Sequence, residues 1–270
     1  MRAALQGADV RGITSLLVAR HGKLAVERYF GGTHPGDRVP VFSITKSVTS
    51  ALVGLAIADG RLTGLSERLP WRRQITLGQL LSMSAGYGRG LNFEDADPAA
   101  LAGRPLVSKP GTTFAYDSGS LNLVARMLAD ATAISAADYA RRRLFAPMGI
   151  RDVLWPGSHG ASGLQLRPRE LLAFGQMYLD HGVWRGKRIV PASWVRASTS
   201  AHIAVPPDQG IYSGYGYGWW VAPNSFAAHG YLGQVLAVFP RLEEVVVVTS
   251  AREDGRTFYL VRRIADATRA

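Results

Sequence analysis

Hydrophobic and polar residues follow one pattern at the two ends of the chain and another in its middle. Short β-branched or apolar runs, which are typical of strands, occur near both ends at residues 13–18, 24–30, 217–222, 234–239 and 245–250. His21-Gly22-Lys23 joins the first two runs as a hairpin signal, and residues 240–244 link the last two. We expect these runs to form one antiparallel sheet.

The middle of the chain has helical periodicity instead. Apolar residues recur at helical spacing in segments that Gly- and Pro-rich loops separate, at residues 47–58, 77–82, 120–131, 136–144 and 168–180. A last segment, 257–268, places Leu260, Val261, Ile264 and Ala265 on one helical face that can cover the sheet. This order predicts an α+β protein: an antiparallel sheet built from both chain ends and flanked by helices, with an inserted helical lobe.

The length of 270 residues fits one cooperative domain that contains a sizeable inserted lobe. Within this single domain, residues 1–270, we place the sheet subdomain at about 1–40 and 205–270 and the helical lobe at about 41–204. The sequence shows no internal repeat, low-complexity tract or flexible linker that would divide it.

Composition narrows the classes of partner. A formal net charge of +11 and a pI near 10.3 are compatible with an anionic partner. However, the arginines are spread along the chain, and their one run, Arg141-Arg142-Arg143, fits a solvated helix face, so we expect no nucleic acid. No segment reaches the about 18 consecutive apolar residues of a membrane span, and residues 1–10 contain no signal-like apolar stretch. We therefore expect a soluble, cytoplasmic protein with no membrane partner.

The candidate chemistry begins at VFSITKSVTSALVGLAIADG, residues 41–60, where a scarce lysine follows Ser43 by three residues. If a helix begins here, Ser43 and Lys46 share a face and the amine can reach the hydroxyl. Serine needs a base to become a nucleophile, and a helix N-terminus favours a developing oxyanion. The same field, with apolar neighbours such as Val41 and Phe42, disfavours an ammonium ion. Lys46 can therefore act as that base, which arginine could not.

Spacing alone does not decide between this interpretation and a structural one. Ser-x-x-Lys arises by chance in a chain of this length, and on spacing alone a Ser43 that caps the helix, with Lys46 on the surface, is the more common arrangement. Further motifs are needed to separate the two interpretations.

Further motifs follow in order along the chain. SITK (43–46) precedes SALVGLAIADGRL (50–62), YDS (116–118) and HGYLGQ (229–234), the last of which comes before an apolar hairpin. Together they resemble the serine β-lactamase-like superfamily, in particular its class C-like branch, the bacterial esterases with a β-lactamase fold and the 6-aminohexanoate-dimer hydrolases. The resemblance covers nearly the whole chain and includes ITLGQLLSMSAGY, RPRELLAFGQMYLDHGVWRGKRIVPASWV and YGYGWW.

The resemblance implies roles for Ser43, Lys46 and Tyr116. Ser43 would be the acylated nucleophile and Lys46 its amine partner. Tyr116, the first residue of the family's Tyr-x-Asn motif, would exchange protons with Ser43 and the leaving group. This role is chemically reasonable, because a lysine ammonium stabilises a neighbouring phenolate. A core tyrosine is the alternative for Tyr116.

The resemblance also places HGYLGQ where the family has a strand carrying Lys-Thr-Gly or a variant. The backbone N–H of Tyr231 would form an oxyanion hole with that of Ser43, and Gly230 would permit close backbone approach. His229 would hydrogen-bond the substrate, or would be structural, as lone histidines more often are.

Two departures from the family pattern bear on the substrate. Ser118 stands where the family has asparagine, so a contact with an acylamide side chain is weakened or replaced by water. The lysine of Lys-Thr-Gly is missing, which removes a cation that would meet a substrate carboxylate. Both changes count against efficient penicillin or peptidoglycan chemistry and leave ester or small-amide hydrolysis.

Other chemistries fit the sequence less well. SMSAG (82–86) lacks the first glycine of the Gly-x-Ser-x-Gly elbow, and Ser84 follows a helical run, so we expect a loop there. The histidines are scattered without zinc-helix spacing, and no glycine-rich phosphate motif follows a strand, so we expect no metal and no cofactor. In GYGYGWW, at least one of Trp219 and Trp220 should face the site if the strand alternates.

We therefore expect a serine hydrolase that cleaves a small-molecule carboxylic ester or amide through an acyl-enzyme on Ser43. The alternatives are a penicillin-binding or D-amino peptidase-like protein, a weak β-lactamase, and a non-catalytic binding protein of the same fold. The sequence leaves the oligomeric state open.

Overall fold

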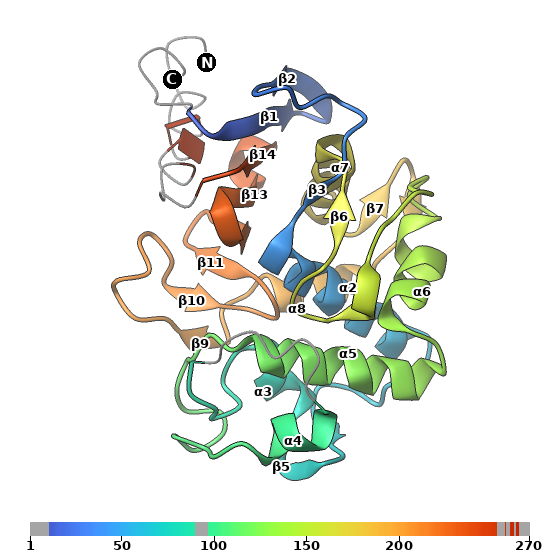
Figure 1. Cartoon of the computed structure of the whole chain (residues 1–270), viewed down its shortest axis with the longest axis vertical. Helices are drawn as coiled ribbons and strands as arrows, with labels where there is room; N and C mark the ends of the chain where they lie inside the picture. The colour runs from blue at the N-terminus through green and yellow to red at the C-terminus, as the bar shows by residue number, and fades with distance from the viewer. Residues whose placement is uncertain (1–10, 90–96, 253–256, 258–259, 262, 265–270) are drawn as a thin grey trace.

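Strands from both chain ends lie in one sheet. A computed structural model describes residues 11–89, 97–252, 257, 260, 261, 263 and 264. Within them, eight strands form an antiparallel sheet in the order β2-β1-β14-β13-β12-β11-β10-β9. Figure 1 shows β1 and β2 beside β14. The predicted fold class is confirmed. The strands are β1 (Ile13–Arg20), β2 (Lys23–Tyr29), β9 (Ile203–Ala204), β10 (Gly214–Tyr215), β11 (Trp220–Ala222), β12 (Ser225–Gly230), β13 (Gln234–Phe239) and β14 (Glu244–Ser250).

β14 lies between a strand from the start of the chain and a strand from its last third. It pairs with β1 from Ile13↔Ser250 to Arg20↔Glu244, and with β13 on its other side. Every residue of β14 is buried, because helix α7 (Pro168–Leu179) packs on one face of the sheet and Leu260, Val261 and Ile264 pack on the other. A strand that is covered on both faces needs no polar alternation, which explains its unbroken run of valines.

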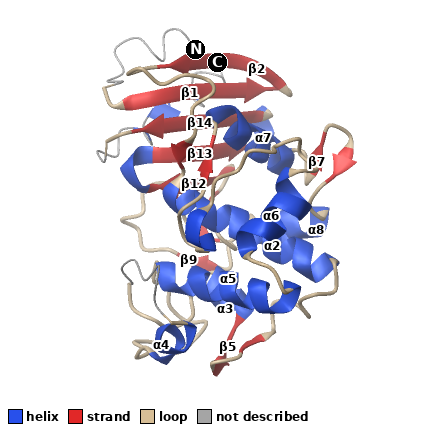
Figure 2. Cartoon of the chain, turned by 45° about the vertical axis from the view of Figure 1, so that its right-hand side comes forward, coloured by secondary structure: helices blue, strands red, loops and turns tan. Residues whose placement is uncertain are grey.

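Most helices lie together on one side of the sheet, as Figure 2 shows. α2 is the central one and contacts α5, α6 and α8. Each segment predicted as helical between residues 47 and 180 contains a helix. Among the described helices, the short α4 and α8 were not predicted, since they show few periodic positions. The helices besides α7 are α2 (Thr45–Ala58), α3 (Leu77–Leu81), α4 (Pro98–Gly103), α5 (Ser118–Thr132), α6 (Ala136–Ala140), which a π-helical turn (Arg141–Phe145) continues, and α8 (Ala192–Ser198).

Small two-stranded ladders complete the described fold. They pair β3 (Val39–Pro40) with β6 (Gln165–Leu166), β4 (Arg68–Leu69) with β5 (Arg72–Thr76), and β7 (Val183–Trp184) with β8 (Lys187–Arg188).

Described residues of the C-terminal segment lie against the second face of the sheet. Its described residues are helical, and Leu260, Val261 and Ile264 are buried in a smaller core with Leu16, Val248 and their neighbours. The prediction that this segment covers the sheet is confirmed for those three side chains. Ala265, which was expected on the same face, lies outside the described residues.

The predicted strand over residues 217–222 was wrong in extent. The chain turns between β10 and β11, where Gly218 has a φ of +78° and the Gly216 N–H bonds to the Trp219 carbonyl. Only residues 220–222 of the predicted run are strand, because glycine readily takes the left-handed conformation that this turn requires. The neighbouring β12 was missed as a run, since SFAAHG has no β-branched residue.

The arginine run lies on an exposed face, as expected. Arg141, Arg142 and Arg143 are exposed, and Arg141 and Arg143 pair with Asp138 and Asp59. No helix in the described ranges is long and apolar enough to cross a membrane. In the same ranges, no group of three or more His, Cys, Asp and Glu side chains is suited to hold a metal ion.

Candidate active site

Ser43 lies in a 3₁₀ turn, Phe42–Ile44, that runs directly into α2. Val41 and Ile44 are fully buried in the main core and fix this turn, while Ser43 itself is half-buried. The N-cap residue of α2 is Ile44, and no side chain caps the helix there. The alternative that Ser43 is a helix-capping serine is therefore wrong.

Lys46, in the first turn of α2, is only 1% exposed and is not a surface lysine. Its Nζ donates hydrogen bonds to Ser43 Oγ at 2.7 Å and to the Ala161 carbonyl oxygen at 3.1 Å, and it lies 5.0 Å from the ring centre of Tyr116. None of these partners is a carboxylate. This setting is unusual, because lysine side chains are almost never fully buried unless they are paired.

The loop at Ala161 fixes the second partner of Lys46. Thr49 Oγ1 donates to the Gly160 carbonyl oxygen at 2.8 Å, and Asn122 Oδ1 accepts from the Ala161 N–H at 3.1 Å. The loop is thus tied to both α2 and α5. The sequence motifs did not mark it, because it contributes a backbone carbonyl, which every residue carries.

Tyr116 lies two residues before α5, with Lys46 over its ring. Its ring stacks on Trp220, with 5.6 Å between centroids and 16° between planes, and meets Tyr215 edge-on at 6.2 Å. Trp220 is half-buried whereas Trp219 is fully buried, so one of the two tryptophans faces Tyr116, as expected. Burial and the nearby Tyr116 raise the pKa of Tyr215, which therefore stays a neutral phenol.

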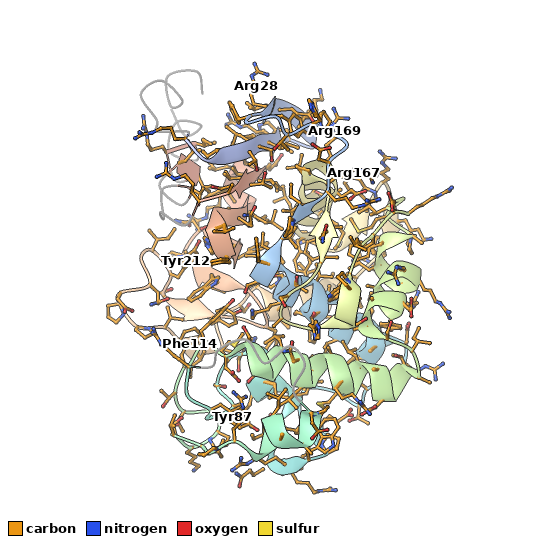
Figure 3. All side chains as sticks on the ribbon, viewed as in Figure 1. Arg28, Tyr87, Phe114, Arg167, Arg169 and Tyr212 are labelled. Carbon is orange, nitrogen blue, oxygen red and sulfur yellow. The ribbon has the colours of Figure 1, made fainter. Side chains whose placement is uncertain are left out.

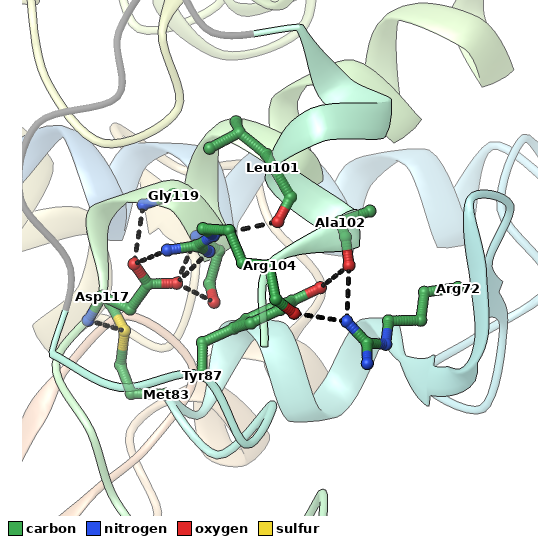
Figure 4. Close-up of polar contacts among 9 residues, drawn as sticks. Arg72, Met83, Tyr87, Leu101, Ala102, Arg104, Asp117 and Gly119 are labelled. Carbon is green, nitrogen blue, oxygen red and sulfur yellow. Dashed lines mark hydrogen bonds and ion pairs between the residues drawn. The ribbon is translucent and has the colours of Figure 1, made fainter. Parts of the chain in front are cut away.

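Asp117 anchors the chain next to Tyr116 (Figure 4). Its carboxylate caps α5 by accepting from the Gly119 and Ser120 N–H groups, and it pairs with both terminal nitrogens of Arg104 at 3.0 and 2.8 Å. The Arg104 guanidinium also lies over the Tyr87 ring, 4.2 Å from its centre. The sequence motif YDS contained Asp117, but its partner Arg104 is 13 residues away and carried no signal.

Ser118, the third residue of YDS, begins α5 and is half-buried. Its position follows directly from the cap that Asp117 forms. A contact between Ser118 and a substrate stays a prediction.

The end of β12 lies against the turn that carries Ser43. β12 contacts the turn Phe42–Ile44, and the Tyr231 ring meets the Phe42 ring edge-on at 5.6 Å. A Cβ atom on Gly230 would lie 2.3 Å from the Val41 carbonyl oxygen, so only glycine allows this approach. Gly230 and Tyr231 are therefore neighbours of the residues that flank Ser43. The oxyanion role of the Tyr231 N–H stays a prediction.

His229 is bonded to a residue that the motifs did not include. Its Nε2 lies 2.5 Å from the Tyr212 hydroxyl oxygen, and Trp220 contacts the rings of both residues. Burial lowers the pKa of His229 to about 4, so the imidazole is neutral near pH 7 and can accept a hydrogen bond from the Tyr212 hydroxyl. A direct contact between His229 and a substrate stays a prediction.

The structure thus brings Tyr116 next to Lys46, the partner of Ser43, although Tyr116 lies far from both in the sequence. Ser84, the serine of the rival motif, is instead 4% exposed, follows α3 in a loop and shares a 2.8 Å hydrogen bond with Ser82. The expectation of a loop at SMSAG is confirmed. A buried hydroxyl that follows a helix cannot serve as a strand-to-helix nucleophile elbow.

Comparisons with known proteins agree on one family. The family model described as Beta-lactamase matches residues 2–269 of the chain. The 6-aminohexanoate-dimer hydrolase of Paenarthrobacter ureafaciens is 26% identical over 289 residues, which span 90% of this chain and 74% of that protein.

Solved structures share the fold along almost the whole chain. The octameric penicillin-binding protein homologue from Pyrococcus abyssi superposes with a TM-score of 0.80 at 20% identity and covers 98% of this chain and 75% of its own. EstCE1, a hydrolase with promiscuous acyltransferase activity, has a TM-score of 0.83 at 16% identity, with 100% and 97% covered. At these identities the likeness shows the fold alone.

Proposed function

Because this chain belongs to the beta-lactamase family of hydrolases, we propose that it is a serine hydrolase that cleaves a small carboxylic ester or amide through an acyl-enzyme on Ser43. The observation that carries the proposal is the contact between Lys46 Nζ and Ser43 Oγ at 2.7 Å, in a setting where Lys46 is buried without a carboxylate. A structural role for Lys46 does not explain why an amine is buried beside a hydroxyl.

Acylation would begin at this contact. Lys46 Nζ or Tyr116 Oη accepts the Ser43 proton, and Ser43 Oγ attacks the substrate carbonyl carbon. The tetrahedral oxyanion is held by the backbone N–H groups of Ser43 and Tyr231. Tyr116 then gives a proton to the leaving oxygen or nitrogen as its bond to carbon breaks, and water hydrolyses the acyl-enzyme by the reverse proton path.

The relatives support acyl transfer and an amide substrate. EstCE1, of the same fold, is a hydrolase with promiscuous acyltransferase activity. The Paenarthrobacter relative is a 6-aminohexanoate-dimer hydrolase, which makes an amide the second candidate. A neutral His229 at the end of β12 offers no cation to a substrate carboxylate. This feature favours an uncharged ester over a penicillin.

The test of the proposal compares wild type, Ser43→Ala and Ser84→Ala with p-nitrophenyl butyrate, a penicillin and the linear dimer of 6-aminohexanoate. We expect a butyryl adduct by intact-mass spectrometry and p-nitrophenol release in wild type and Ser84→Ala, and neither in Ser43→Ala. Dimer cleavage without ester turnover would favour the amide class. Activity that survives Ser43→Ala would exclude Ser43 as the nucleophile.

Lys46→Arg tests the base. Arginine carries a fixed positive charge and does not give up its proton in a protein, so it cannot accept the Ser43 proton and kcat/KM for the ester should fall about 10³-fold. Lys187→Arg, an equivalent change on exposed β8, is the matched control and should keep wild-type kcat/KM. A fully active Lys46→Arg enzyme would contradict the assignment of Lys46 as the base.

A further inference from the structure

Aromatic side chains form a continuous wall beside Tyr116. We use the term aromatic wall for Phe114, Tyr212, Tyr215, Trp220 and His229. Trp220 is its centre: the ring centroid lies 5.7 Å from that of Phe114, 5.6 Å from Tyr212 and 5.1 Å from Tyr215. Figure 3 shows Tyr212 and Phe114 on the same side of the molecule, where the strands of the sheet meet the helical part.

The wall has a supported side and an open side. Phe114 and Tyr215 are buried, whereas Trp220 and Tyr212 are only half-buried. The two buried rings therefore support Trp220 from within the protein. Trp220 and Tyr212 each keep part of their surface exposed to solvent.

Tyr212 comes from the loop between β9 and β10, yet its ring is held in place. Its hydroxyl is bonded to His229 Nε2, and its ring is tilted against that of Trp220 by 40°. The bond ties the loop to β12, the strand whose end contacts the turn of Ser43. A loop side chain that is fixed in this way can contribute to recognition without a large ordering cost.

We propose that Trp220 and Tyr212 bind an uncharged aromatic group carried by the leaving alcohol or amine of the substrate. The proposal rests on the proposed function, because that mechanism has Tyr116 protonate the leaving atom. Trp220 stacks directly on Tyr116, so a group attached to the leaving atom lies closest to the aromatic wall. Neutral aromatic faces and edges favour another ring through stacked or edge-to-face contacts.

Benzyl butyrate and ethyl butyrate test the proposal, because both form the same butyryl-enzyme and differ only in the leaving alcohol. The wild-type enzyme should have a higher kcat/KM for benzyl butyrate. In Trp220→Leu, both values fall since Tyr116 loses its stacking partner, but the benzyl-to-ethyl ratio should also drop about fivefold. Tyr212→Leu, which keeps Trp220 against Tyr116, should lower the ratio as well.

Trp184→Leu is the matched control, since Trp184 lies on β7 and donates to the Met148 carbonyl, outside the wall. It should keep the wild-type ratio. If Trp220→Leu or Tyr212→Leu hydrolyses both esters with an unchanged ratio, the aromatic subsite is wrong while the serine hydrolase stands. If none of these esters, p-nitrophenyl butyrate included, forms an acyl-enzyme on Ser43 of the wild type, the proposal of ester hydrolysis is wrong. The proposal of the aromatic subsite is then wrong as well.

Discussion

Burial separates Lys46 from the other lysines of the chain. Lys23, Lys109 and Lys187 are exposed, as is usual for a side chain with a charged, flexible end. Lys46 is fully covered, and its amine is held between Ser43 and the Ala161 carbonyl. Its position is therefore set by the fold before any substrate binds, which is what a proton acceptor for a weak nucleophile requires.

His229 should make stability depend on pH. Its folded-state pKa is about 4, below the about 6.5 of an unfolded histidine, so the unfolded chain binds the proton first on acidification. The stability that comes from keeping His229 neutral is fully present above about pH 6.5 and is lost as the pH falls toward 4. We expect the free energy of unfolding to decrease by about 2 kcal/mol over this range. Urea unfolding of wild type and His229→Asn at pH 7 and pH 4.5 measures it.

Tyr212 does not add to this pH dependence, because burial raises its pKa and it keeps its proton throughout the range. His229→Asn should lose less stability than wild type on acidification. His34→Asn, at an exposed histidine, is the matched control and should follow wild type. If wild type and His229→Asn lost the same free energy of unfolding between pH 7 and pH 4.5, His229 would not be the source of the pH dependence.

At the scale of elements, the N-terminus of α5 determines where Tyr116 lies. Asp117→Ala removes the cap of this helix and leaves the Arg104 guanidinium without its carboxylate. We expect a loss of about 3–5 kcal/mol in the free energy of unfolding, since one partner of a largely buried ion pair is removed. The lower stability should be accompanied by a lower kcat, because Tyr116 is no longer held, and both are measured by urea unfolding and ester kinetics.

Asp97→Ala is the matched control for this prediction. Asp97 caps α4 through the Ala100 N–H but is exposed, so its loss should cost only about 1 kcal/mol. Equal costs for the two variants would show that the Arg104 pair adds nothing to the cap.

The elements differ in how far the sequence predicts them. β13 and the centre of α2 follow from local pattern alone, because each contains an unbroken run of residues suited to its structure. The hairpin of β10 and β11 does not follow from local pattern, since its glycines permit both a strand and a turn until the pairing with β12 is known.

The same limit applies to the site. Motif spacing identified Ser43 and Lys46. Arg104 and Tyr212 were missed, because their partners Asp117 and His229 are distant from them in the sequence.

At the scale of the whole molecule, the site depends on contacts between both chain ends and the middle. β1 pairs with β14 across more than two hundred residues, and the same sheet includes β12, whose end contacts the turn of Ser43. Folding the sheet and assembling the site are therefore coupled. This coupling is the physical basis for expecting one cooperative domain rather than two separable lobes.

A substitution in β14 tests that expectation. Val247 is fully buried and lies between Leu17 of β1 and Leu236 of β13, so Val247→Ala should cost about 2–3 kcal/mol by leaving a cavity. If the chain unfolds as one unit, native-state hydrogen exchange should show the most protected amides of β1 and of α2 losing the same free energy of opening. Val26→Ala, on the edge strand β2, is the matched control with a smaller effect. Unchanged protection of α2 in Val247→Ala would mean that the helical lobe opens independently, and the site would then be an interface between two folding units.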